Sequence, residues 1–324
     1  MEEHTGLIVR GINNIYTVKE GKKSYLCRIK GKQLAQVQRE YNPLAVGDFV
    51  HFAVSGDSEG LITERLERKN SFQRWNAKGG CNQTVVANMD LIVCVSSVDS
   101  PPFRPRFIDR VIACCQDVEV MIVLNKCDIL LTEDEHERFV LYKKLGYPIL
   151  GVSAKTTENL QKLMTMLKGK TVAFVGQSGV GKSTLINSML DVDQRTAQVC
   201  EKYNRGRHTT NHSLLFEGED FNLVDTPGVR EIMVPHKDAG YLSHAFPEFA
   251  AYAKKCAFEG CLHADEPDCA VKDAVEEDAI HYDRYESYLR MLASLDEKQP
   301  DWVGKHDRSK SWNNRMDRDE SQEY

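Results

Sequence analysis

The order of four short motifs limits the topology that this chain can adopt. A glycine-rich segment that ends in Lys-Ser lies at 176–183, and Asp-Thr-Pro-Gly follows it at 225–228. Asn-Lys-Cys-Asp at 125–128 and Ser-Ala-Lys at 153–155 come before both of them. In an unpermuted nucleotide-binding α/β domain, the glycine-rich loop comes first and the other motifs follow it. The observed order therefore predicts a circularly permuted domain in which all four motifs still form one site.

The glycine-rich segment has the composition of a phosphate-binding loop. An apolar strand is expected at 171–175 and a helix at 183–190, which is the context that such a loop requires. Its backbone amides would wrap a phosphate at the positive end of the helix, and its lysine would bridge the β- and γ-phosphates. The predicted nucleotide-binding residues here are Gly176, Gln177, Ser178, Gly179, Val180, Gly181, Lys182, Ser183 and Thr184.

Two earlier loops predict which base is bound. The carboxylate of Asp128 can accept the N1 and N2 hydrogens of guanine, whereas adenine offers no such pair. Asn125 is expected to support this loop, and the stem of Lys126 to lie along the base. The second loop places a backbone amide where it can meet guanine O6, and it consists of Ser153, Ala154 and Lys155. Together the two loops predict GTP and GDP as ligands.

A Mg²⁺ ion is expected beside the phosphates. Ser183 would give its hydroxyl to the ion, and Asp225, at the end of a strand, would hold it through water. Gly228 would offer its amide to the γ-phosphate. Residues 204–212 take the place of the first switch loop, where Thr210, in preference to the threonine before it, is expected to complete the Mg²⁺ site.

The residue after Gly228 bears on how GTP is hydrolysed. Many GTPases have a glutamine there that orients the attacking water, but this chain has Val229, which cannot donate or accept a hydrogen bond. Hydrolysis should therefore be slow or depend on another residue. His236 is the first candidate and His208 the second, with His212 also in the switch region; the alternative for each is an ordinary surface histidine.

A second cluster of ligand-type residues lies near the C-terminal end. Cys256, Cys261, His263 and Cys269 supply three thiolates and one imidazole within 14 positions. Four strong protein ligands are the set of a closed structural zinc site, whereas a catalytic zinc keeps one position open. The alternative is three buried cysteines and a surface histidine, but the neighbouring acidic residues disfavour a buried core. The pattern predicts one structural zinc ion.

Residues 1–70 read as a separate β-rich domain. Short strands are expected at 6–10, 14–18, 24–29, 46–54 and 61–66. That number of strands in so short a segment suits a small closed barrel, and the oligonucleotide-binding (OB) fold is the commonest barrel of this size. The alternative is a packing module without a ligand.

The rest of the chain divides into two further domains. A permuted GTPase domain is expected at 71–235. Its first part, within residues 69–83, reads as a polar linker, and apolar strands and helices alternate after that. Residues 236–324 are expected to form a helical zinc-binding domain that ends in a polar tail. The predicted helices of that domain cover 248–255, 270–277 and 282–295.

The overall composition restricts which classes of partner, such as RNA or a membrane, the chain can bind. The net charge is −6, and residues 236–324 hold 20 acidic but only 12 basic groups, so any RNA contact must come from local basic patches. The sequence has neither an apolar run long enough to span a membrane nor a signal peptide. We therefore expect a cytoplasmic protein without a membrane contact, and separately we expect a monomer. The remaining cysteines read as packing residues.

These motifs together resemble one family, the circularly permuted RsgA (YjeQ) GTPases of ribosome assembly. The resemblance rests on the four nucleotide motifs, on Gly-Arg-His-Thr-Thr at 206–210, on Asp-Thr-Pro-Gly-Val-Arg at 225–230 and on the Cys-x₄-Cys-x-His-x₅-Cys cluster. It extends from the barrel to about residue 295. The resemblance implies an OB-fold barrel, a permuted GTPase domain and a C-terminal zinc domain.

The resemblance also implies a function. The family binds the small ribosomal subunit late in assembly near the decoding region of 16S rRNA, and subunit binding stimulates its GTP hydrolysis, which favours release. The family has an apolar residue matching Val229 and a proposed catalytic histidine matching His236. Two alternatives remain: a GTP-dependent binding factor that hydrolyses GTP incidentally, and a GTPase that serves a protein or metal-delivery partner. One hypothesis is that the nucleotide state reorients the zinc domain through the switch.

Overall fold

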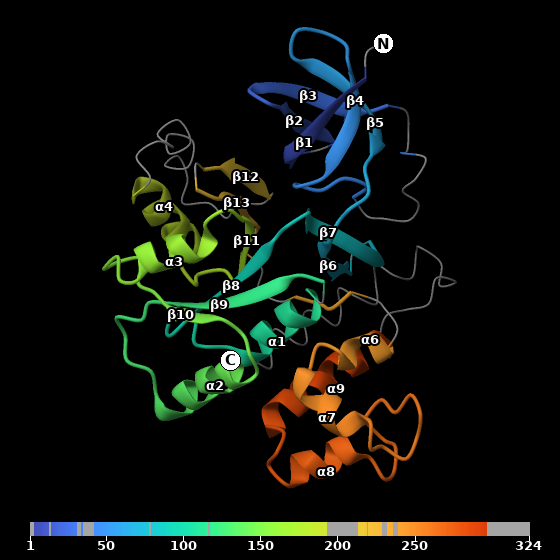
Figure 1. Ribbon diagram of the computed structural model, residues 1–324, viewed down its shortest axis with the longest axis vertical. Helices are drawn as coiled ribbons and strands as arrows, with labels where there is room; N and C mark the ends of the chain where they lie inside the picture. Colours follow the sequence, from blue (N-terminus) through green and yellow to red (C-terminus); the bar gives the residue numbers. More distant parts are fainter. Residues whose placement is uncertain are drawn as a thin grey trace.

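The computed structural model describes residues 3–12, 14–30, 34, 42–77, 79–115, 117–192, 213–218, 220–228, 232–235 and 239–296. Figure 1 shows three parts along the long axis of the molecule. A small β-barrel lies at the top, an α/β domain in the middle and a group of helices at the bottom. Among the described residues, none of the helices combines the length and the apolar composition needed to cross a lipid bilayer.

The expected N-terminal barrel is confirmed. It consists of β1 (Glu3–Ile12), β2 (Ile15–Glu20), β3 (Lys23–Ile29), β4 (Phe49–Val54) and β5 (Glu59–Arg65). Antiparallel pairing of β1 with β4 closes the barrel, and β3 pairs in parallel with β5. Alternate side chains point inward, as the two-residue period of a strand requires. The interior includes Ile8, Val18, Val50, Phe52 and Ile62, all with no exposed surface.

The central domain contains the expected sheet covered on both faces. Its strand order is β10-β9-β8-β11-β13-β12, with β12 antiparallel to β13 and the other pairs parallel. The strands are β8 (Leu91–Ser97), β9 (Glu119–Asn125), β10 (Ile149–Gly151), β11 (Thr171–Gly176), β12 (Leu214–Glu217) and β13 (Asn222–Asp225).

Two hydrophobic cores hold the helices against this sheet. One core joins α1 (Pro105–Ala113) and α2 (Glu133–Lys144) to one face, and the other joins α3 (Leu160–Leu167) and α4 (Lys182–Val192) to the opposite face. Every residue of β8 is buried, because helices cover both sides of it. This buried sheet is the rigid support for the loops at its carboxyl edge.

The expectation of a polar linker at 69–83 was wrong. Most of this segment belongs to a β-hairpin of β6 (Ser71–Asn76) and β7 (Cys81–Ala87), which lies between the barrel and the central sheet (Figure 1). The hairpin is polar overall but has an apolar face. Phe72 and Val86 are paired across its two strands, and both are part of the core of the central domain. The two glycines that suggested a linker lie at the turn instead.

The C-terminal part is helical, as expected, but its first predicted helix is interrupted. The segment 248–255 is a 3₁₀ turn, η1 (Pro247–Phe249), followed by the short helix α7 (Ala250–Ala253). A further short helix, α6 (Ala239–Ser243), was not expected, whereas α8 (Ala270–Glu276) and α9 (Tyr282–Asp296) match their predictions closely. The polar tail from 297 onward lies outside the described residues.

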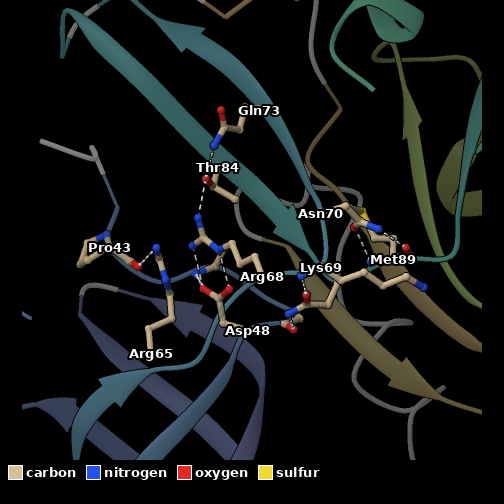
Figure 2. Close-up of polar contacts among 12 residues, drawn as sticks. Pro43, Asp48, Arg65, Arg68, Lys69, Asn70, Gln73, Thr84 and Met89 are labelled. Atoms are coloured by element: carbon tan, nitrogen blue, oxygen red, sulfur yellow. Dashed lines mark hydrogen bonds and ion pairs between the residues drawn. The ribbon is translucent and has the colours of Figure 1, made fainter. Parts of the chain in front are cut away.

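A buried ion pair fixes the barrel to the central domain. Arg68 donates from Nε to Oδ1 of Asp48 at 2.7 Å and from Nη2 to Oδ2 at 2.8 Å (Figure 2). Its Nη1 donates to the hydroxyl of Thr84 on β7 at 3.0 Å, so one guanidinium joins the barrel to the hairpin. Gly47 fits beside Ala87 only because it lacks a side chain: a Cβ there would lie 2.0 Å from the Ala87 carbonyl oxygen.

A second buried arginine fixes the helical part to the opposite side of the central domain. Arg284 on α9 donates from Nη1 to Asp109 on α1 and from Nε to Oε1 of Glu248 at 2.7 Å. Tyr142 on α2 also donates to Asp109, at 2.6 Å. Two partly exposed ion pairs also cross this boundary, Arg106–Glu286 and Arg138–Asp283.

Candidate nucleotide and metal sites

The four predicted loops meet at one edge of the central sheet. Gly176 ends β11, Asn125 ends β9 and Asp225 ends β13, while Ser153 follows β10 by two residues. Because these strands are parallel neighbours, their carboxyl ends lie side by side, where ligands bind in folds of this kind. The rotated order of the motifs therefore still produces one continuous site.

The phosphate-loop residues have the geometry that the sequence predicts. Gly179 and Gly181 adopt φ of 87° and 83°, a region that favours glycine, and α4 begins at Lys182. Lys182 is 5% exposed, and its Nζ donates to Oδ1 of Asp225 and to the carbonyl oxygen of Thr226. The loop thus places a lysine and an aspartate together at the start of a helix. The ammonium of Lys182 and the amides at the start of α4 are the groups that fit a phosphate, and the exposed positions beside them include Ser178, Ser183 and Thr184.

Asn125 joins the phosphate loop to the base-recognition loops. Its Nδ2 donates to the carbonyl oxygen of Val180 at 2.9 Å, and its Oδ1 accepts from the amide of Ala154 at 3.1 Å. A Cβ at Gly181 would lie 2.4 Å from this Nδ2, so the contact also requires glycine there. The Ala154 amide, which the sequence predicts as a partner of guanine O6, is bonded to Asn125 in this structure. Its contact with the base stays a prediction.

The carboxylate of Asp128, which is predicted to recognise the base, is held in position by a serine. The hydroxyl of Ser153 donates to Oδ1 of Asp128 at 2.7 Å and accepts from the amide of Thr156 at 3.1 Å. The bond from Ser153 lowers the pKa of Asp128 below its usual value, so this carboxyl stays ionised at neutral pH. Lys155 lies close enough to add to this effect. A charged, oriented acceptor is what recognition of the N1 and N2 hydrogens requires.

Lys126 makes contacts that the sequence did not predict. Its Nζ donates to the carbonyl oxygens of Asp99 and Ser100 at 2.6 Å each, and it lies 3.4 Å from that of Gly179. The lysine therefore links the base loop, the loop after β8 and the phosphate loop. The turn sequence Asp-Ser-Pro-Pro directly after a buried strand was the available signal for a functional loop there.

The switch residues are only partly placed. A Cβ at Gly228 would lie 3.4 Å from Cα of Ser178, so Asp-Thr-Pro-Gly approaches the phosphate loop closely. Thr226 anchors this segment by donating its hydroxyl to the Phe174 carbonyl oxygen at 2.7 Å. The catalytic candidates and their neighbours lie outside the described residues, namely His208, Thr209, Thr210, His212, Val229 and His236.

The four predicted zinc ligands converge. The ligand atoms of Cys256, Cys261, His263 and Cys269 all lie within 4.8 Å of one another. Sγ of Cys256 is 3.9 Å from Sγ of Cys269, and Nδ1 of His263 is 3.6 and 3.4 Å from these two sulfurs. Zn–S bonds of about 2.3 Å in a tetrahedron place sulfurs about 3.8 Å apart. The cluster therefore fits a zinc ion through the Nδ1 atom of the histidine.

The loop that carries these ligands is supported from its own domain. Tyr285 and Tyr288 on α9 donate to the carbonyl oxygens of His263 and Leu262. The carboxylate of Glu266 accepts the amides of Leu262 and Ala264 at 2.7 and 2.9 Å. These bonds orient the ligands from outside, as is usual for metal sites.

Comparison with known proteins identifies the family. The profile of the RsgA GTPase family matches residues 65–235, and that of the RsgA N-terminal domain matches residues 5–62. The chain is 38% identical over 296 residues to the small ribosomal subunit biogenesis GTPase RsgA of Borrelia garinii subsp. bavariensis, covering 89% of this chain and 95% of that protein. Identity to the protein of the same name from Flavobacterium psychrophilum is 35% over 306 residues, covering 90% and 94%.

Solved structures agree with this assignment. YjeQ from Thermotoga maritima superposes with a TM-score of 0.66 at 31% identity, covering 91% of this chain and 99% of that one. YloQ, described as a circularly permuted GTPase, superposes with a TM-score of 0.64 at 26% identity, covering 93% and 98%. The predicted permutation is thereby confirmed. The chain is a GTP-hydrolysing enzyme and belongs to the RsgA GTPase family.

Proposed function

We propose that this GTPase acts in the late assembly of the small ribosomal subunit, where it binds 16S rRNA and hydrolyses GTP to GDP and phosphate when the subunit stimulates it. The observation that supports the proposal is that Asn125 joins the predicted phosphate and guanine loops, on a chain that matches, over about nine-tenths of its length, proteins named for biogenesis of that subunit. A cytoplasmic monomer is the form that we propose acts there.

The nucleotide would be held by groups that already lie together. Lys182 leaves Asp225 to bridge the β- and γ-phosphates, and the amide of Gly228 approaches the γ-phosphate from the switch side. Asp128 accepts from the guanine base, in the orientation that Ser153 gives it. A Mg²⁺ ion held by the side chains of Ser183, Asp225 and Thr210 would neutralise charge on the phosphates.

Hydrolysis needs a group that orients water, and Val229 cannot supply it. We propose His236 for this role, with His208 as the second candidate, because both belong to the segments that surround the γ-phosphate in GTPases. A residue that completes the site only on the subunit would explain a stimulated hydrolysis. The barrel and the zinc domain are the proposed RNA-binding parts, because they flank the nucleotide domain (Figure 1).

Two features of the structure affect how a change from GTP to GDP would move the zinc domain. The chain passes from Gly228 toward that domain through residues 232–235, which are fixed to the central domain. Ile232 and Val234 are buried in its core, and the carbonyl oxygen of Met233 accepts from the amide of Trp75 at 2.9 Å. In addition, Arg284 and Asp109 are 2% exposed and join α9 to α1. A rotation of the zinc domain away from α1 would separate this buried pair, at a large cost in free energy. We therefore propose that α1 moves together with the zinc domain.

GTP turnover by the purified chain tests the proposal. It would be measured alone, with small subunits and with large subunits as the control. Stimulation by the small subunit alone supports the proposed role, and loss of that stimulation in His236→Ala, with GTP binding retained, supports the catalytic assignment. GTP binding without stimulation by either subunit favours the alternative of a GTP-dependent binding factor with another partner.

A further inference from the structure

A cavity outside the nucleotide and zinc sites lies beside the start of α2. Its volume is about 560 Å³, and its apolar wall includes Val98 and Leu124, at the ends of β8 and β9, together with Leu131. Leu124 belongs to the hydrophobic core under α1 and α2, whereas Val180 of the phosphate loop belongs to the core of the opposite face. The cavity is therefore on the other side of the sheet from α4.

Two apolar side chains at the mouth of this cavity face water. Leu130 is 94% exposed and Ile129 is 40% exposed, and both line the cavity. The fold accounts for Leu131, which packs against the core, but no such contact accounts for Leu130. Adjacent exposed apolar residues at the rim of a cavity are typical of an interaction surface.

The surroundings of the cavity are acidic. Glu133 and Glu137 line it, and Asp134 lies between them on the exposed first turns of α2. Within the described parts of the chain, Glu133 and Asp134 form no ion pair. The helix dipole explains acidic residues in the first turn of α2, but Glu137 lies beyond that turn.

The cation of α2 that follows these acidic residues already has a partner. Arg138 forms an ion pair with Asp283, so it does not pair with Glu133 or Asp134. The charges of Lys126 and Lys155 act on the exposed carboxylate of Asp128, at the start of the same segment. A negative rim repels the phosphates of a nucleic acid and attracts lysine and arginine side chains.

We propose that this cavity is a docking site for a basic protein segment that inserts one apolar side chain beside Leu130, while its lysines or arginines pair with Glu133 and Asp134. The site is independent of the proposed rRNA contacts, since it uses neither the barrel nor the zinc domain. Its wall includes Cys127, the neighbour of Asp128, so the partner touches the segment that recognises guanine.

Binding of synthetic peptides to the full-length chain tests this site. Fluorescein-labelled peptides of 12 residues would carry a single Leu, Phe or Met between lysines and arginines, with matched peptides that have Ser at the anchor position. Fluorescence anisotropy at low salt should show that the anchored peptides bind at least about tenfold more tightly, because a buried large apolar side chain contributes that much. Added salt should weaken them.

Variants of the chain locate the binding. Leu130→Ser should remove the advantage of the anchored peptides, and Glu133→Gln with Asp134→Asn should weaken all basic peptides several-fold. The matched controls are Met166→Ser, an exposed apolar residue on α3, and Glu276→Gln on α8, and both should bind as the unchanged chain does. Circular dichroism confirms that each variant is folded.

Four results would overturn the proposal. The first is that no anchored peptide binds, and the second is that the anchored and Ser-containing peptides bind alike. The third is that a 12-nucleotide oligouridylate binds and loses affinity in Leu130→Ser, which would make the occupant RNA. The fourth is that the chain alone forms a dimer that Leu130→Ser dissociates, which would make the occupant a second copy.

Discussion

Replacement of Arg284 by methionine tests how the zinc domain is held. The guanidinium contacts carboxylates on both sides of the domain boundary, Asp109 on α1 and Glu248 at η1, and its carbon lies 4.4 Å from the centre of the Phe246 ring. Methionine keeps most of the apolar volume and the packing against this ring. It removes the charge, so Asp109, which is 2% exposed, is left buried without its cation.

The expected loss is large because the pair is buried. Removing one partner of a buried ion pair costs about 3–5 kcal/mol, whereas an exposed pair contributes up to about 1 kcal/mol. At about 2–4 °C per kcal/mol for a unit of this size, Arg284→Met should lower the melting temperature by roughly 10 °C. Arg290→Met on the same helix is the matched control, since its partner Glu286 is one turn away and Arg290 is 53% exposed.

Calorimetry of the full-length, zinc-loaded chain provides the measurement. The control should melt within about 2 °C of the unchanged chain, and Asp109→Asn should recover part of the loss when combined with Arg284→Met, because the buried charge is then gone. Equal melting temperatures for Arg284→Met and Arg290→Met would refute the reasoning. So would an Arg284→Met protein that melts with the unchanged chain.

Three further predictions concern the other sites. Asp128→Asn should weaken GTP binding at least roughly tenfold in titration calorimetry, because a charged hydrogen bond to the base is lost; unchanged affinity would contradict the assigned role. Cys269→Ser should release zinc, seen as less than one bound metal per chain by elemental analysis, and should melt like the chelator-treated unchanged chain. Gly47→Ala should cost more than about 2 kcal/mol in denaturant unfolding, because its Cβ meets the Ala87 oxygen, whereas Gly21→Ala, which has no atom within 4 Å, should cost only about 1 kcal/mol.

The parts that sequence predicted well are those governed by local pattern. Buried strands such as β8 and β9 are continuous apolar runs, and each is followed by a loop whose residues have a specific chemical use. Thr132 and Glu135 form a capping box at the start of α2, which is also a local pattern of the sequence. The convergence of Cys256, Cys261, His263 and Cys269 was predictable because all four lie within 14 positions, although bonds from α9 and Glu266 complete their arrangement.

The parts that it missed depend on contacts distant in sequence. The segment of β6 and β7 was predicted as a linker because it is mostly polar in sequence. Its few apolar side chains are buried only by contact with the core of the central domain, which the local sequence does not show. The partner of Arg68 is 20 positions away and that of Arg284 is 175 positions away. A buried charge has no periodic signature, and its partner is set by how the domains pack.

The permuted order has a consequence for how the appended domains are attached. In this chain α3 is joined to β11 by residues 168–170 alone. The two ends of the domain lie instead before β8 and after β13, the two strands that neighbour β11. In the unpermuted order the domain would begin at β11 and end after α3, and both of those ends lie at the sheet edge away from the nucleotide.

Only the permuted order places a covalent exit at the nucleotide edge, because β13 ends there at Asp225. The zinc domain follows this exit and is held a second time by Arg284 against α1. The loop that leads into α1 contains Ser100, whose carbonyl oxygen accepts from Lys126 of the base-recognition loop. The zinc domain is thus connected to the Asp225 side of the predicted site through the chain, by way of Ile232 and Val234 in the central core, and to the Lys126 side through packing. A rearrangement near Lys126 has a physical route to that domain through α1, whereas one near Asp225 must first move the buried Ile232 and Val234.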